Sequence, residues 1–111
     1  MKIICYARKQ NLIVGIDGDI DHHSAEIIRD KLEREFTRAG AKNIIFDFKK
    51  VSFMDSSGIG MILGRYRALE KLGGMVAVAG VSAEASRVFE ISGLHKLIKV
   101  YSGVESAEKY L

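Results

Sequence analysis

Hydrophobic and polar positions follow two different periods along this chain. Two short apolar segments, residues 2–8 and 12–17, flank Lys9-Gln10-Asn11 and predict an antiparallel β-hairpin. From Ser24 to Ala39 the apolar residues instead recur at helical spacing on one face: Ala25, Ile28, Leu32, Phe36 and Ala39. This spacing predicts an amphipathic helix that Ser24 caps and Gly40 ends.

The rest of the chain alternates between the two periods. Strands are predicted over residues 43–48, 75–79 and 97–101. Helices are predicted from the turn at 55–58 to about Leu72, over Ser82–Ile91, and from Ser102 or Gly103 onward. The order predicts an α/β sandwich with a mixed, largely parallel β-sheet, an N-terminal hairpin and about four helices. With 111 residues there is no room for a second core, so residues 1–111 form one domain.

The second predicted helix has apolar residues on two sides. Ile59, Ile62, Leu63, Tyr66 and Leu69 form its core face. Opposite them, Met61, Ala68 and Leu72 form a second apolar strip, although a helix is ordinarily polar on its outer face. Two interpretations stay open: a neighbouring element covers the strip, or the strip is a docking surface for another protein.

Composition and charge narrow the functional classes. The formal net charge is +3 and the basic residues are scattered, whereas nucleic-acid binding usually needs a basic stripe. No apolar run approaches the roughly 18 residues of a membrane span, and the N-terminus lacks a signal-peptide pattern. Cys5 is the only cysteine, which excludes an intrachain disulfide and fits a reduced compartment. We expect a cytoplasmic, monomeric protein that binds no nucleic acid.

Metal and catalytic motifs are missing or incomplete. Asp17, Asp19 and Asp21 have the spacing of a calcium loop, but its sixth and twelfth positions hold His22 and Ile28 instead of Gly and Glu. Neighbouring histidines diverge, so a zinc site lacks converging ligands. Neither a nucleophile elbow nor a phosphate-binding glycine loop is present. The sequence therefore predicts no metal, no cofactor and no catalytic residue, and the protein is not expected to be an enzyme.

The turn Asp55-Ser56-Ser57-Gly58 has two interpretations. It joins a strand to a helix, so either serine can cap the helix with its hydroxyl, and spacing alone favours that structural role. A serine at an exposed helix start is also accessible to a kinase. The helix dipole there favours negative charge, so a phosphate would spare the fold and act on whatever docks at the turn.

Three segments, which together cover nearly the whole chain in order, resemble one protein family. Gly18-Asp19-Ile20-Asp21-His22-His23-Ser24-Ala25-Glu26 is similar to the Gly-Glu-Leu-Asp-His-His-Thr-Ala-Glu segment of SpoIIAA-type anti-sigma factor antagonists, which are single STAS domains. Phe53-Met54-Asp55-Ser56-Ser57-Gly58-Ile59-Gly60 and the residues that follow resemble that family's phosphorylation site and helix. Ser86-Arg87-Val88-Phe89 and Ile91-Ser92-Gly93-Leu94 resemble its third-helix region.

The resemblance implies a partner switch. In this family the unphosphorylated antagonist binds an anti-sigma factor with serine kinase activity and frees a sporulation sigma factor. Phosphorylation of the first serine of the turn, here Ser56, releases the antagonist, and a serine phosphatase restores it. By the same matching, Asp21 corresponds to an aspartate at the kinase interface, and Asp55, Ser57 and Gly58 belong to the recognised turn.

The resemblance also suggests further contacts and leaves rival functions. Met61, where the family usually has Val, and Ile27, near Asp21, become candidate partner contacts. Asp19 and Ser24 replace Glu and Thr, which affects partner identity more than mechanism. The rivals are a STAS antagonist of another stress pathway, a small nucleotide- or ligand-binding STAS module, and a phosphocarrier that uses a histidine.

Overall fold

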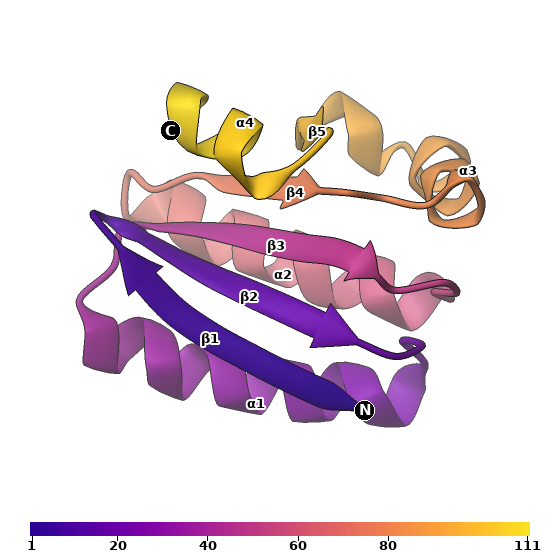
Figure 1. The fold of residues 1–111 in the computed structure, drawn as a ribbon, viewed down its shortest axis with the longest axis horizontal. Helices are drawn as coiled ribbons and strands as arrows, with labels where there is room; N and C mark the ends of the chain where they lie inside the picture. Colours follow the sequence, from indigo (N-terminus) through magenta and orange to yellow (C-terminus); the bar gives the residue numbers. More distant parts are fainter.

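A five-stranded mixed sheet organises the computed structural model, which describes residues 1–111 (Figure 1). Its strands lie in chain order: β1 (Lys2–Arg8), β2 (Asn11–Asp17), β3 (Asn43–Lys50), β4 (Val76–Ala79) and β5 (Val100–Tyr101). β1 and β2 pair antiparallel as a hairpin, and all other neighbours pair parallel. The predicted fold class, a mixed and largely parallel sheet with an N-terminal hairpin, is confirmed.

Helices cover the two faces of the sheet unequally. They are α1 (His22–Ala39), α2 (Ser56–Lys71), α3 (Ala83–Ser92) and α4 (Val104–Tyr110), with a 3-10 turn at Leu94–Lys96. In Figure 1, α1 and α2 lie behind the sheet and the short α4 lies on its near side. None of the helices combines the length and the apolar character needed to cross a lipid bilayer.

The alternation of side chains along the strands creates two separate apolar clusters. On the α1–α2–α3 face, strand residues such as Val14 and Phe46 pack with helix residues such as Ile28 and Ile62 in a core of 21 buried residues. On the other face the cluster has only five buried residues, one of which is Ala107 of α4. The second face is therefore covered at β4, β5 and the first half of β3, and left open at β1, much of β2 and the end of β3.

The predicted cap of the first helix is wrong by three residues. Asp21, not Ser24, is the N-cap of α1, and the helix begins at His22. The Asp21 carboxylate accepts a hydrogen bond from the Ser24 N–H at 2.9 Å, and the Ser24 hydroxyl accepts one from the Asp21 N–H at 2.8 Å. This reciprocal capping box places Ser24 inside the first turn. The predicted end is confirmed, since Gly40 adopts the left-handed conformation with φ 64°.

The last predicted strand is also too long. Instead of residues 97–101, only Val100–Tyr101 pairs with β4. Leu97 and Ile98 both donate backbone hydrogen bonds to the Leu94 carbonyl, which keeps this segment in a turn after Gly93. The apolar pattern was right about burial, because Ile98 belongs to the core, but its burial is achieved by a turn rather than by a strand.

Candidate functional site

Two loops at the carboxyl ends of β2 and β3 are bonded to each other. The Gly18 N–H donates to the Lys50 carbonyl at 3.2 Å, and the Asp55 N–H donates to the Ile20 carbonyl at 3.1 Å. The Ser52 hydroxyl donates to the Asp19 carboxylate at 2.9 Å. These bonds hold the starts of α1 and α2 next to each other, so the predicted site residues of the two loops form one surface.

Asp55 caps α2, which leaves the adjacent serines free of that role. Its carboxylate accepts a hydrogen bond from the Ser57 N–H at 2.8 Å. Ser56 is the first residue of α2, its side chain is exposed, and its hydroxyl takes part in no hydrogen bond within the protein. Ser57 is half-buried. The sequence offered either serine as the cap of this helix, but Asp55 takes that position, and Ser56 presents its hydroxyl to solvent.

Gly58 holds this turn closely against the neighbouring loop. It is buried, and a Cβ atom at this position would collide with the Met54 side chain and lie 3.2 Å from Ile20 Cγ2. A larger residue would therefore force the buried Met54 side chain to move or push α2 away from the β2–α1 loop. The contribution of Gly58 to this surface is close packing beneath it.

Asp21 combines the capping of α1 with full exposure to solvent. The pKa of its carboxyl is lowered, first by the hydrogen bond from the Ser24 N–H and then by the one from the Ser24 hydroxyl. His22 and His23, which follow it, are also exposed. Asp21 therefore presents a stable negative charge beside the Ser56 turn.

Of the two interpretations of the second apolar strip of α2, coverage by a neighbouring element applies to Met61, which shares no exposed surface with Leu72. Met61 is 7% exposed and belongs to the main core, whereas Leu72 is 72% exposed and lies at the opposite end of α2. The reason is that α1 packs beside α2 and covers this side of it. Met61 reaches the surface only in a groove between the two helices.

This interhelical groove adds basic residues that the sequence analysis missed. Arg29 of α1 and Arg65 of α2 line it, together with Gly60, Gly64 and the start of α1. Arg65 pairs with Glu33 across the helices at 3.0 Å, while its Nε is buried without a hydrogen-bond partner. Helical periodicity gave no signal for the groove, because the groove depends on how α1 and α2 are placed relative to each other.

Two further apolar side chains are exposed near this surface. Phe53, in the loop directly before the Ser56 turn, is 53% exposed, and sequence analysis did not single it out. Ile27 of α1 is 46% exposed, but it does not line the groove. The structure thus brings together Asp21, Asp55, Ser56, Ser57 and Gly58, whereas Ile27 is exposed on α1 outside the groove. No group of three or more His, Cys, Asp or Glu side chains is arranged to hold a metal ion.

Comparison with known proteins gives consistent matches. The family model of the STAS domain matches residues 2–107. An anti-sigma F factor antagonist of Paenibacillus polymyxa is 36% identical over 96 residues, which cover 86% of this chain and 82% of that protein. The anti-sigma-B factor antagonist of Bacillus subtilis (strain 168) is 36% identical over 95 residues, covering 83% and 85%. The solved structure of the anti-sigma factor antagonist SpoIIAA in its unphosphorylated form superposes with a TM-score of 0.83 at 30% identity, covering 98% and 96%.

Proposed function

The chain belongs to the STAS domain family, and on that premise we propose that it is an anti-sigma factor antagonist controlled by phosphorylation of Ser56. In the unphosphorylated state it binds an anti-sigma factor that is also a serine kinase. Phosphorylation releases it, and a serine phosphatase returns it to the binding state. It acts as a cytoplasmic, monomeric binding protein and not as an enzyme.

The observation that carries this proposal is the free hydroxyl of Ser56. Because Asp55 caps α2, phosphorylation of Ser56 breaks no hydrogen bond of the fold. The added charge of roughly −1.5 to −2 lies at a helix start, where the dipole favours it. The modification therefore leaves the domain folded and changes only the surface that a partner meets.

Release follows from the chemistry of the transfer. A kinase must bring the γ-phosphate of its nucleotide to the Ser56 hydroxyl, so after transfer the phosphoserine faces the remaining diphosphate. Like charges opposed in a desolvated interface cost several kcal/mol. Asp19, Asp21 and Asp55 add further negative charge on the same surface, which makes the phosphorylated state still harder to hold there.

The site is tested by intact-mass spectrometry after incubation with ATP and an anti-sigma kinase. We expect one added phosphate on the wild type and on Ser57→Ala, and none on Ser56→Ala. The Ser57→Ala variant is the matched control, because it removes the neighbouring hydroxyl of the same turn. A phosphate on Ser56→Ala would move the site elsewhere, and a bound but unmodified wild type would contradict regulation by this kinase.

We further propose that the protein acts in a sporulation pathway and not in a general-stress pathway. The sigma-F and sigma-B antagonists each share 36% sequence identity with this chain, so sequence identity does not decide between the two pathways. The Asp21-His22-His23 segment favours the sporulation type. Affinities for one sporulation kinase and one general-stress kinase, measured side by side, decide between them, and tighter binding to the stress kinase would favour the second pathway.

A further inference from the structure

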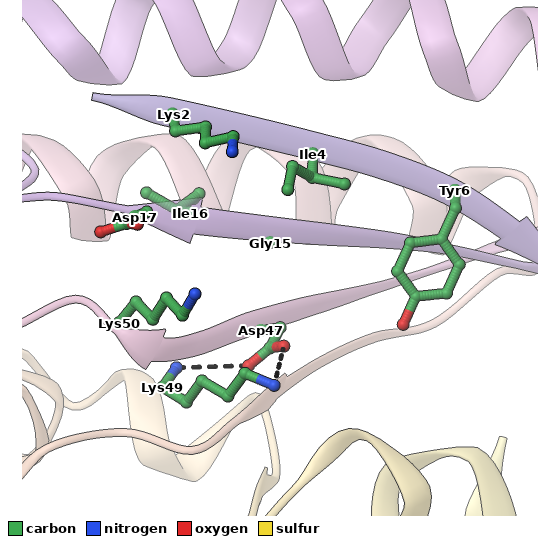
Figure 2. Close-up of a pocket in the computed structure, with 9 residues that line it drawn as sticks. All are labelled: Lys2, Ile4, Tyr6, Gly15, Ile16, Asp17, Asp47, Lys49 and Lys50. Carbon is green, nitrogen blue, oxygen red and sulfur yellow. Dashed lines mark hydrogen bonds and ion pairs between the residues drawn. The ribbon is translucent and has the colours of Figure 1, made fainter.

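A hollow of about 250 Å³ lies on the open half of the second sheet face, away from the helices α1 and α2 (Figure 2). Three strands line it, with one rim on β1 and the other on β3. The lining residues are Lys2, Ile4, Tyr6, Gly15, Ile16, Asp17, Asp47, Lys49 and Lys50. The short helix α4 does not reach this part of the sheet, so the hollow is open to solvent.

Gly15 forms the floor of the hollow, and the fold itself does not require a glycine there. Its φ is not in the left-handed region. A Cβ atom would meet only the Ile4 carbonyl oxygen at 3.6 Å, an ordinary contact. Glycine inside a strand costs stability, and it often marks a β-bulge or a place where a ligand or another backbone approaches closely. The pairing of β2 with β3 shifts register between Gly15 and Asp17, and the space above Gly15 is empty of protein, so a ligand can approach the backbone at this irregular point of the strand.

The rims carry cations that the protein does not neutralise. Lys49 pairs with Asp47 at 3.8 Å. Lys2 and Lys50 both lie opposite Asp17 in the strand register, but neither makes an ion pair with it. In Figure 2 the ammonium groups of Lys2 and Lys50 extend from opposite rims over the hollow. Three lysines against two aspartates, Asp17 and Asp47, leave an excess of one positive charge, which suits a single acidic group better than a polyphosphate.

The other end of the hollow is apolar and aromatic. Tyr6 is 40% exposed and Ile4 is 52% exposed. The Tyr6 ring leans from β1 across β2 toward β3 (Figure 2), and the Arg8 guanidinium lies 5.6 Å from its centroid. The Tyr6 ring and the Ile4 side chain together offer a surface against which a flat ring can pack.

We propose that this hollow binds a small organic anion that carries an aromatic ring. The ring packs against Ile4 and Tyr6 over the Gly15 floor, and the single acidic group meets Lys2 and Lys50. The site uses none of the residues of the Ser56 surface, so the inference stands independently of the proposed function.

The test is a titration followed by amide NMR, with 2-naphthoate as the probe. We expect saturable shifts at Gly15, Asp17 and Lys50. Acetate lacks the ring and 2-naphthol lacks the charge, so each should bind about tenfold more weakly or not at all. No saturable shifts with 2-naphthoate, equal shifts with either control compound, or shifts confined to other residues would overturn the proposal.

Two variants sharpen the test. Gly15→Val fills the floor and should weaken 2-naphthoate about tenfold or more, while its unfolding midpoint should not fall because valine suits a strand. Lys50→Ala, an exposed change, should weaken the probe without affecting the fold even if Gly15→Val proves unstable. Unchanged affinity in Lys50→Ala would overturn the proposal. Binding of the anti-sigma kinase to Gly15→Val should equal that of the wild type, which separates the two proposals.

Discussion

The starts of α1 and α2 lie side by side and are both capped by aspartate, but they use their serines differently. In α1 the cap is reciprocal, so the Ser24 hydroxyl is engaged with Asp21 and the residue is 8% exposed. In α2 the Asp55 carboxylate caps alone, and Ser56 remains exposed with a free hydroxyl. A serine at a helix start is thus available for modification only where its hydroxyl takes no part in the capping hydrogen bonds.

The largest expected effect comes from placing a negative charge at Ser56, at the start of α2. Ser56→Asp should weaken binding to the anti-sigma kinase by roughly a hundredfold, or about 3 kcal/mol, because the charge is buried in the interface. Ser56→Ala should bind like the wild type but resist release by ATP. Isothermal titration calorimetry with the purified kinase measures both. Equal affinity of the two variants would show that charge at this position does not control docking.

Two variants of intermediate effect separate the capping role of Asp21, at the start of α1, from its role in docking. Asp21→Ala and Ser24→Ala both break the capping box, so each should lower the free energy of unfolding by about 1 kcal/mol. Because small domains have about 5–15 kcal/mol of stability, both variants should stay folded. Only Asp21→Ala removes the exposed carboxylate, so only it should weaken kinase binding.

Urea unfolding gives the free energy of unfolding, and calorimetry on the same samples gives the affinity for the kinase. Equal loss of affinity in the two variants would mean that Asp21 matters for the kinase only through the stability of α1. Unchanged affinity in both would remove Asp21 from the interface altogether.

The features that sequence predicted well are those determined by local chemistry. Gly40 ends α1 in the left-handed conformation, as its position predicted, and α3 lies within one residue of the predicted range Ser82–Ile91. The cap of α1 was misassigned because Asp21 and Ser24 are both good capping residues, and only the backbone path of the loop decides between them.

Features that depend on packing between elements could not be predicted in this way. Met61 faces α1, and its burial follows from the placement of two helices that are distant in sequence. The last strand is short because Leu97 and Ile98 bond to the Leu94 carbonyl in a turn, which leaves only Val100 and Tyr101 to pair with β4. The hollow over Gly15 arises because α4 covers only part of one sheet face, which no periodicity along the chain records.

The smallest expected effect is the pH dependence of the stability that Asp21 gives to the start of α1. The pKa of Asp21 is lowered in the folded protein, so its carboxylate stabilises the fold above the ordinary aspartate pKa of about 3.9. This stabilisation is lost as the pH falls through the lower, folded pKa. Asp21→Asn retains a good capping residue but cannot titrate.

The difference in unfolding free energy between wild type and Asp21→Asn should therefore be constant near neutral pH and shrink below about pH 4. Urea unfolding across this range measures it, with Ser24→Ala as a second comparison. Ser24→Ala removes the hydroxyl but keeps the backbone N–H, the larger cause of the lowered pKa, so it should reduce the pH dependence without abolishing it. A difference that does not change with pH would mean that Asp21 stabilises α1 through the geometry of its hydrogen bonds alone. Its negative charge would then contribute nothing to the stability of the fold.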